Sequence, residues 1–435
     1  MKSDSVTFPR DHCHRHGLND EVHARPSVAM HAPMRASYIL CYSSADTIEA
    51  EQQAINDLTS LFNVAPPKAG DNHYLADLGS LRLKWERHTE FIGYTFFVSG
   101  MTDNPFANPV VKQLPAEWLA ALPGEALLAS HITLMDAKQD IPDHEQISHE
   151  MFNGNALIGA HIADGAGIAM TDFRIQADGF SRLLVANRQM TPRQTGRNIQ
   201  RLLEIDSYRM MALLALPMAR ELSPFLARSE QELVQITTAL AGPEDADELS
   251  LLNRLTCLQA DIESRYSSSN YRFGAANAYY MLVQRRITDL REKRIQGLQT
   301  FREFTERRLA PAMDTCQAVA VRQQSLTQGV ERATQLLSTR VDMERREQNQ
   351  SVLESMDRRA GFQLRLQEAV EAVSIVAVTY YLVGLVGFAS EGVHAVYETL
   401  ETSLVKAISI PVIATLVIIV MRRIRKTVVK RSGKE

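Results

Sequence analysis

The sequence is poor in cysteine and carries no strong excess of either charge. Its four cysteines include no CxxC pair, and 47 lysines and arginines nearly balance 51 aspartates and glutamates. Cysteines this scattered exclude a disulfide scaffold or a zinc ribbon and suit a reducing compartment. A net charge of −4 argues against a dedicated nucleic-acid-binding protein, for which a strongly basic domain is expected. We therefore expect no nucleic acid among the partners of the chain.

The motifs of the common nucleotide-binding and hydrolytic enzymes are also missing. The sequence contains no GxxxxGK[ST], GxGxxG, HExxH or GxSxG. We therefore assign no catalytic residue and identify no cofactor, and the balance favours a protein that is not an enzyme.

What the sequence does contain is a long chain with two apolar runs near its end. Its 435 residues exceed the ~250–300 that one compact core usually holds, so several parts are expected. We predict an α+β cytoplasmic domain (1–190), a helical bundle or stalk (191–371), a two-helix transmembrane hairpin (372–421) and a basic cytoplasmic tail (422–435).

The two apolar runs are long enough to cross a bilayer. Residues 372–389 carry no charge and, at ~1.5 Å per residue, form a helix of ~27 Å, close to the ~30 Å hydrocarbon core. Residues 403–421 reach ~28 Å, with Lys406 near one end, where its ammonium can extend to the headgroups. The alternative is a buried helix pair in a soluble domain.

Positive charges lie before the first run and after the second, and the connection between the runs is nearly free of them. Arginines at 358, 359 and 365 precede the first run and four Lys/Arg lie in 422–426, whereas the connection 390–406 has three glutamates and one lysine. The positive-inside rule then puts both termini in the cytoplasm and the connection outside. The first residues, MKSDSVTFPRDHCHRHG, contain no apolar stretch of signal-peptide length, so we expect everything before 372 to stay cytoplasmic.

One face of the first run carries small or hydroxyl-bearing residues. These are Ser374, Ala377, Tyr381, Gly384 and Gly387. Small residues let membrane helices approach closely, so the face is interpreted as a helix-packing surface. The alternative is a pore lining, in which the two hydroxyls would face the permeant species.

The segment before the membrane is predicted to be helical. Residues 249–367 are rich in helix formers and contain one proline, Pro311. Apolar residues recur at helical spacing in a broken repeat, which favours long hairpins or a bundle with coiled-coil packing over one clean heptad coil. The run SSSN at 267–270 predicts a turn, and a helix from about Thr327 is expected to continue into the first apolar run.

The amino-terminal part shows the alternation of strands. It predicts a helix at 45–62 and a mostly antiparallel sheet, hence an α+β domain and not a Rossmann fold. The predicted strands are 35–42, 81–86, 91–98, 127–135, 156–162, 168–175 and 180–187.

Two groups of polar residues near the amino terminus are candidate sites. Asp20, Glu21, His23 and Arg25 could serve in acid–base chemistry or anion binding, and the alternative is an ion-pair network or helix cap. The HCHRH run at 12–16 offers imidazole and thiolate, but nothing in this polar segment presets a coordination geometry, so the metal stays unknown.

Several strings resemble a family of bacterial membrane-anchored proteins grouped as domain of unknown function 3422. They are LNDEVHARP at 18–26, GRNIQRLLEIDSYRMMALLALPMAREL at 196–222, YRFGAANAYY at 271–280, RRLAPAMDTC at 307–316 and the run at 339–388. The resemblance implies a Gram-negative inner-membrane protein with a large cytoplasmic region and brings no established activity.

The order of the parts is also similar to that of CorA-type divalent-cation channels. Those proteins carry Gly-Met-Asn at the outer end of the first span, where this chain has Val383-Gly-Leu-Val-Gly-Phe388. Gly387 stands where that glycine does, and the Met and Asn are absent. This resemblance is one of architecture, which does not fix function.

Three functional hypotheses follow. The first is a membrane-anchored cytoplasmic module that senses or scaffolds, with the lipid bilayer and further copies of itself as partners. The alternative is a CorA-like transporter, whose partner would be a divalent cation. The second alternative is a membrane-tethered enzyme that uses Asp20, Glu21, His23 and Arg25.

Overall fold

The computed structural model describes residues 9–432 except 24–25, 69, 103, 105, 138–142, 243–246 and 395–401, and it leaves out the side chains of 20–23, 45, 394, 402 and 425–432. Contacts within the chain define two compact units, Met1–Thr334 and Gln335–Glu435. The first unit contains a sheet and the helices that pack on it, and the second is helical. The first unit thus contains the sheet together with the helical residues up to Thr334.

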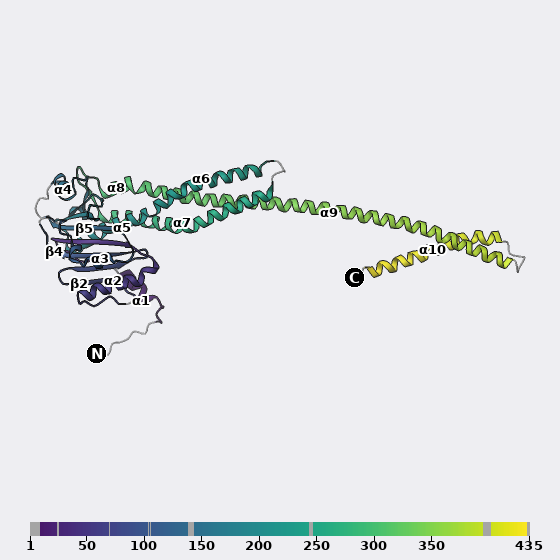
Figure 1. Cartoon of the computed structure of the whole chain (residues 1–435), viewed down its shortest axis with the longest axis horizontal. Helices are drawn as coiled ribbons and strands as arrows, with labels where there is room; N and C mark the ends of the chain where they lie inside the picture. Colours follow the sequence, from purple (N-terminus) through teal and green to yellow (C-terminus); the bar gives the residue numbers. More distant parts are fainter. Residues whose placement is uncertain are drawn as a thin grey trace. The chain divides into compact units, whose positions relative to one another are not determined.

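A nine-stranded sheet forms the centre of the first unit (Figure 1). Its order is β2-β3-β4-β1-β5-β8-β7-β6-β9, and β5–β8 is the one parallel pair among antiparallel neighbours. The strands are β1 (Met34–Tyr42), β2 (His73–Asp77), β3 (Arg82–Arg87), β4 (Phe91–Ser99), β5 (Glu125–Asp136), β6 (Ile158–Ile162), β7 (Gly167–Thr171), β8 (Ser181–Asn187) and β9 (Lys293–Arg294).

The helices follow the strands or lie between them. They are α1 (Arg15–His23), α2 (Ile48–Leu61), α3 (Ala116–Ala120), α4 (His144–Met151), α5 (Pro192–Leu213), α6 (Ala215–Leu240), α7 (Glu248–Leu290), α8 (Phe301–Arg308), α9 (Ala310–His394) and α10 (Thr402–Ser432). The prediction of a sheet-rich α+β domain followed by a long helical region is confirmed.

The helices α2 and α3 cover one face of the sheet around β1, β3 and β4. Leu58 of α2 and Trp118 of α3 pack against Trp85 and Tyr94, which point to this face. Each fully buried large apolar side chain stabilises the fold by roughly 1.5–3 kcal/mol. The indole of Trp118 donates a hydrogen bond to the Ala54 carbonyl at 2.7 Å, so its polar atom is also satisfied.

The opposite face of the sheet is covered by α5. A capping box at Thr191 begins the helix, with Pro192 at its first position. Gly196 lies where the extended segment before β1 crosses the helix, and a Cβ there would lie 1.8 Å from the Val28 carbonyl oxygen. Glycine at this position lets the two backbones meet.

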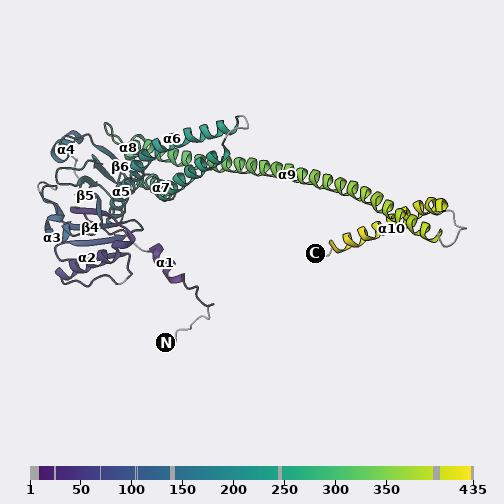
Figure 2. The same cartoon turned by 45° about the vertical axis from the view of Figure 1, so that its right-hand side comes forward.

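The helices α6 and α7 and the first part of α9 form a bundle in which they run side by side (Figures 1 and 2). Arg322 of α9 makes two hydrogen bonds with Glu230 of α6, at 3.0 and 2.7 Å. Ser269 of α7 lies 3.0 Å from the Gln323 amide oxygen of α9. The predicted turn at 267–270 is therefore wrong. Ser269 is buried in the middle of α7, where its hydroxyl bonds within the helix and across the bundle.

The segment between α7 and α8 returns to the edge of the sheet as β9. Glu292 lies before this strand and accepts hydrogen bonds from the backbone N–H groups of Phe301 and Arg302, both at 3.0 Å. It therefore satisfies donors that the first turn of α8 leaves free. Burial raises the pKa of Glu292, and the two backbone donors oppose that rise.

The second unit contains the end of α9 and α10. An apolar window in each of these helices is long enough to cross a membrane, and so is one in Pro192–Leu240. Only 6% of the residues in the windows of α9 and α10 are buried, against 33% in the third. Lys406 of α10 forms an ion pair with Glu391 of α9 at 2.7 Å.

Candidate functional site

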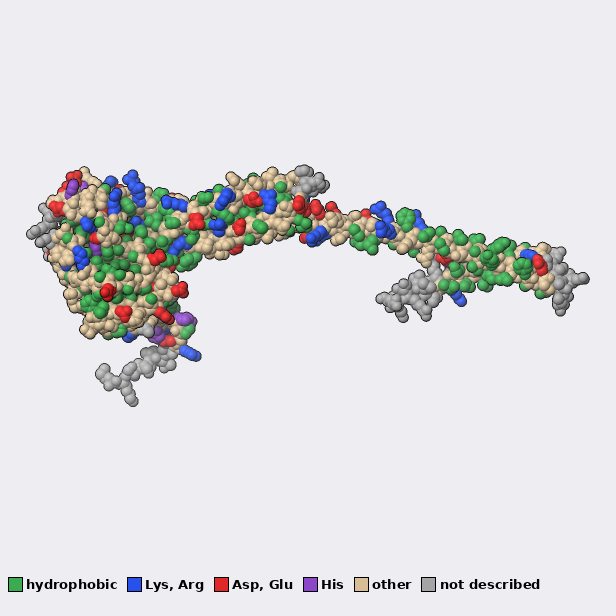
Figure 3. Space-filling view, viewed as in Figure 1, with side chains coloured by type: hydrophobic (Ala, Val, Ile, Leu, Met, Phe, Trp, Pro, Cys, Tyr) green, Lys and Arg blue, Asp and Glu red, His purple; other side chains and the backbone are tan. Residues whose placement is uncertain are grey.

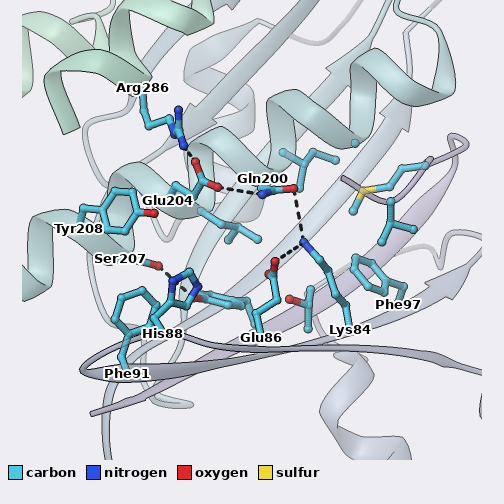
Figure 4. A pocket seen from close by; sticks show the side chains of 17 residues that line it. Lys84, Glu86, His88, Phe91, Phe97, Gln200, Glu204, Ser207, Tyr208 and Arg286 are labelled. Atoms are coloured by element: carbon cyan, nitrogen blue, oxygen red, sulfur yellow. Dashed lines mark hydrogen bonds and ion pairs between the residues drawn. The ribbon is translucent and has the colours of Figure 1, made fainter. Parts of the chain in front are cut away.

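A cavity of about 280 Å³ lies between the sheet and α5 in the first unit (Figure 4). Its floor comes from β1, β3 and β4, its roof from α5, and one end from α7. The lining is part apolar and part charged, and it comprises Val28, Met30, Tyr38, Lys84, Glu86, His88, Phe91, Thr95, Phe97, Gly196, Ile199, Gln200, Leu203, Glu204, Ser207, Tyr208 and Arg286.

Strand β3 places two opposite charges on the floor of the cavity. Lys84 and Glu86 are two residues apart, so they point to the same side of the strand. The Lys84 ammonium lies 2.8 Å from a Glu86 carboxylate oxygen, and only 9% of the lysine side chain is exposed. Leu83 and Trp85 point to the other side, into the core beneath α2.

Polar side chains of α5, in the roof, connect the Lys84–Glu86 pair to α7. Gln200 of α5 accepts a hydrogen bond from Lys84 at 3.4 Å and donates one to Glu204 at 2.8 Å. Glu204 pairs in turn with Arg286 of α7. Figure 4 shows the resulting chain Glu86–Lys84–Gln200–Glu204–Arg286, which joins the sheet, α5 and α7.

A hydroxyl pair lies on the same wall. Tyr38 of β1 and Ser207 of α5 are hydrogen-bonded at 3.1 Å, and both residues are buried. Burial raises the pKa of Tyr38 far above its ordinary value, because its phenolate would be desolvated. The phenol is therefore a neutral donor and acceptor at every physiological pH.

A buried ion pair lies beside the cavity and fastens α7 to the sheet. Arg272 of α7 makes two hydrogen bonds with Glu90, each of 2.9 Å, and both residues are buried. Tyr279 stacks on Tyr208 of the cavity wall with ring centroids 5.8 Å apart. Burial, with the Glu90 charge adding to it, raises the pKa of Tyr279.

A second buried polar group lies on the opposite face of the sheet. Ser37 Oγ is 2.9 Å from His131 Nδ1, and His131 Nε2 is 3.6 Å from an Asp178 oxygen. The order serine–histidine–aspartate is that of a hydrolase, but Ser37 is 0% exposed and offers no nucleophile to a substrate. Burial lowers the pKa of His131 to about 4, and Asp178 opposes that effect.

The cavity combines charged groups with an apolar wall. Its two cations and two carboxylates cancel in charge and lie in a chain of mutual contacts. The described part of the chain contains no group of three or more histidine, cysteine or acidic residues that could hold a metal ion. The arrangement therefore offers hydrogen bonds and an apolar wall to a small molecule.

The polar cluster predicted near the amino terminus stays untested. Asp20, Glu21 and His23 lie in α1, and their side chains are outside the described residues, as is the whole of Arg25. In the HCHRH run, Cys13 Sγ lies 4.0 Å from His12 Nδ1, and the residues are exposed.

The predicted small-residue face of the first apolar run lies in α9. Gly387 is buried, and a Cβ there would lie 2.7 Å from Lys406 Cε of α10. Ala377, Tyr381 and Gly384 are exposed, and Ser374 bonds back to the Val370 carbonyl within the helix. Gly387 thus lies against α10, and Ala377, Tyr381 and Gly384 are exposed among the described residues.

Sequence reasoning missed the residues of the cavity. Lys84 and Glu86 are the one available signal, because two charges occupy same-side positions of a strand whose other side is apolar. Gln200 and Glu204, at i and i+4 of an amphipathic helix, read as an ordinary solvent-facing pair. Nothing in the local sequence places Arg286 beside them.

Comparison with known proteins identifies the family. Residues 10–428 match the family model described as Protein of unknown function (DUF3422). The chain belongs to this family. No curated protein and no solved structure matches it. Membership in DUF3422 confirms the resemblance seen in the sequence, and the likeness to CorA-type channels stays a prediction.

Proposed function

We propose that this DUF3422 protein is a membrane-anchored cytoplasmic sensing module, whose ligand acts on the sheet domain and whose anchor is formed by α9 and α10. One observation carries the proposal. The helix α9 is continuous from Ala310, inside the bundle of the first unit, to His394, and it includes the charge-free apolar run 372–389, many of whose side chains are exposed.

The exposed apolar side chains support a lipid environment for α9 and α10. Val376, Tyr380, Leu385 and Phe388 of α9 are 64–76% exposed, a pattern that a water-soluble surface rarely shows over so long a stretch. Figure 3 shows hydrophobic side chains covering the visible face of this part. Lipid tails would solvate these side chains at no cost.

The third apolar window is better explained by packing in the folded unit. Leu202 and Met211 of α5 and Leu222 and Leu226 of α6 are buried against the sheet and bundle. A helix already packed on water-soluble partners does not need a bilayer, which favours two spans over three.

The charges near the spans support the proposed orientation. Arg422 and Arg423 follow the second span, and Arg358, Arg359 and Arg365 precede the first, so both termini would be cytoplasmic in an inner membrane. The pair Glu391–Lys406 would lie at the outer end of the hairpin. There the lysine is neutralised by its partner and lies against Gly387.

Oligomerisation is part of the proposal because large apolar side chains of the helix before the membrane are exposed. Between 345 and 370 the side chains are exposed almost throughout, including Val352, Met356, Phe362 and Leu366 at 55–70%. In proteins most of the stability of a helix comes from packing of its apolar face. A shared membrane would align other copies in parallel and let these residues pack together.

The proposal is tested on the full-length protein in cells and membranes. Reporter fusions after 388–394 and after Glu435 should report periplasm and cytoplasm respectively, and the protein should need detergent for extraction. A soluble full-length protein, or a periplasmic signal after Glu435, would overturn the anchor. Mg²⁺ or Co²⁺ flux in liposomes that hold the purified protein would replace sensing by the transporter alternative.

A further inference from the structure

The cavity beneath α5 contains charges that the packing of the domain does not require. On the same side of the neighbouring strand β4, Phe91 and Phe97 show that apolar side chains fit this layer. Burying an ion pair is usually no more stabilising than burying apolar side chains of similar volume. The presence of Lys84 and Glu86 on the cavity floor therefore points to a bound polar partner.

Several groups in this lining keep hydrogen-bonding capacity to spare. Among the described residues, the Lys84 ammonium uses two of its three donors, on Glu86 and Gln200, and the second bond is long at 3.4 Å. Within the same set of residues, Glu86 is bonded through one of its two carboxylate oxygens. The hydroxyls of Tyr38 and Ser207 share one hydrogen bond, so one of their two protons is not used between them.

The balanced charges of the lining favour a ligand with no net charge. Two cations face two carboxylates, so a ligand with a single charge would be desolvated without compensation. A molecule with both an ammonium and a carboxylate could instead meet Glu86 with the first and Lys84 with the second. The rest of the lining would cover an apolar body, through Val28, Met30, Phe91, Phe97, Ile199 and Leu203.

The volume sets the size of the ligand. A cavity of about 280 Å³ has room for roughly nine water molecules, at ~30 Å³ each in the liquid. That space is comparable with one free amino acid that carries an apolar side chain.

We propose that the cavity between β3, β4 and α5 binds a small apolar zwitterion of the amino-acid class, held by Lys84 and Glu86. The carboxylate of the ligand takes the spare donor of Lys84 and weakens its long bond to Gln200. Because Gln200 also holds Glu204, the partner of Arg286, occupancy is communicated along the chain of contacts to α7. This site stands independently of the membrane anchor.

Calorimetric titration of the full-length protein in detergent tests the charge requirement. L-Leucine is the probe, and N-acetyl-L-leucine and L-leucinamide are matched ligands that keep the apolar body and lose one charge each. We expect saturable leucine binding and at least about tenfold weaker binding of both derivatives, since each leaves one buried charge without its partner. Absence of leucine binding at millimolar concentration, or equal binding of either derivative, overturns the proposal.

Two variants test the residues. Glu86→Gln keeps the shape of the side chain, and Lys84→Met keeps its apolar stem, and each should weaken leucine binding at least about tenfold. The controls are Glu49→Gln and Lys68→Met at exposed positions, which should bind as the parent does. Circular dichroism and melting of the ligand-free proteins establish that the variants fold. Unchanged leucine binding in folded Glu86→Gln overturns the assignment, even if Lys84→Met fails to fold.

Discussion

The two units of the chain treat apolar side chains in opposite ways. In Met1–Thr334, large apolar residues such as Trp85, Tyr94 and Phe301 are at most 1% exposed. In Gln335–Glu435, Tyr380 and Phe388 are more than 70% exposed, and Leu337 and Val417 are the two buried large apolar side chains among the described residues. The same residue types thus suit two solvents. Water drives the first set inside, and a bilayer would solvate the second.

Charges show the complementary difference. The first unit buries ion pairs such as Glu90–Arg272, in which each carboxylate oxygen has its own donor. The apolar runs of the second unit contain no buried pair in the described residues, and Glu391–Lys406 lies near their ends. A charge is buried where hydrogen-bonding partners surround it, and otherwise it lies near the end of the apolar segment.

The largest expected effect comes from breaking a buried pair of the first unit. Glu90→Gln leaves the Arg272 guanidinium buried without a counter-charge, and it should lower the free energy of unfolding by about 3–5 kcal/mol. Urea denaturation of the full-length protein in detergent measures the loss. The double variant Glu90→Gln/Arg272→Met is the control and should recover much of it. If the double variant is as unstable as the single one, the loss is not due to the unpaired charge.

A charge in the second unit should act on insertion instead of folding. Leu416→Arg places a guanidinium in the middle of the second apolar run, at a cost of about 2.5–3.5 kcal/mol if that run lies in lipid. Membrane fractionation should then show less protein that stays in the membrane pellet without detergent, with the sheet unit still folded. Leu336→Arg, at a position that is 70% exposed but outside the apolar runs, should insert normally. If the two variants insert into the membrane equally well, the second apolar run does not lie in lipid.

A smaller effect is expected from the pH dependence of stability in the first unit, where His131 is buried. The native pKa of His131 is about 4 because the ring is buried, whereas the unfolded ring has its ordinary value near 6.5. Between these values the unfolded state binds a proton that the native state does not. The contribution of neutral His131 to the free energy of unfolding is therefore fully present above about pH 6.5. It is lost as the pH drops toward 4, by up to about 3 kcal/mol.

Urea midpoints measured from pH 7 to pH 4 check this expectation. The folded variant His131→Gln should lose this component of the slope, although it starts from lower stability. His73→Gln, at an exposed site, should keep the slope of the parent. A parent protein with no loss of stability in this window contradicts the assignment to His131.

The smallest effect is expected at the bundle surface. Arg322 and Glu230 have side chains about two-fifths exposed, at 38% and 40%, and solvent screens their attraction. Arg322→Met should change the free energy of unfolding by less than about 1 kcal/mol, despite its two good hydrogen bonds. A loss as large as that of Glu90→Gln would mean that exposure does not separate the two kinds of pair.

Local patterns revealed most of the sheet. Seven strands followed from alternation and turn signals, because one or both of their faces are buried. The missed strands are β2, which lies at an edge with most residues exposed, and β9, which is only two charged residues long. Neither carries an apolar pattern, and both are strands only because a neighbour supplies the hydrogen bonds.

The turn predicted at 267–270 was wrong, and the cavity was not predicted, for related reasons. Serines favour turns locally, but Ser269 is held in α7 by Gln323, more than fifty residues away. Likewise, the Lys84–Gln200 and Glu204–Arg286 contacts join residues that are distant in sequence. Such pairs carry no short-range signal.

The sequence by itself determined where apolar residues accumulate, and therefore which segments become strands, which become helices and which are long and apolar enough to cross a membrane. Periodicity and length are local properties, so they survive in the bare chain. Only the tertiary structure decided that Lys84 and Glu86 meet Gln200 beneath α5, and that Arg272 reaches Glu90. The physical reason is that a buried charge is stable only beside its partner, and the fold alone determines which residues become partners.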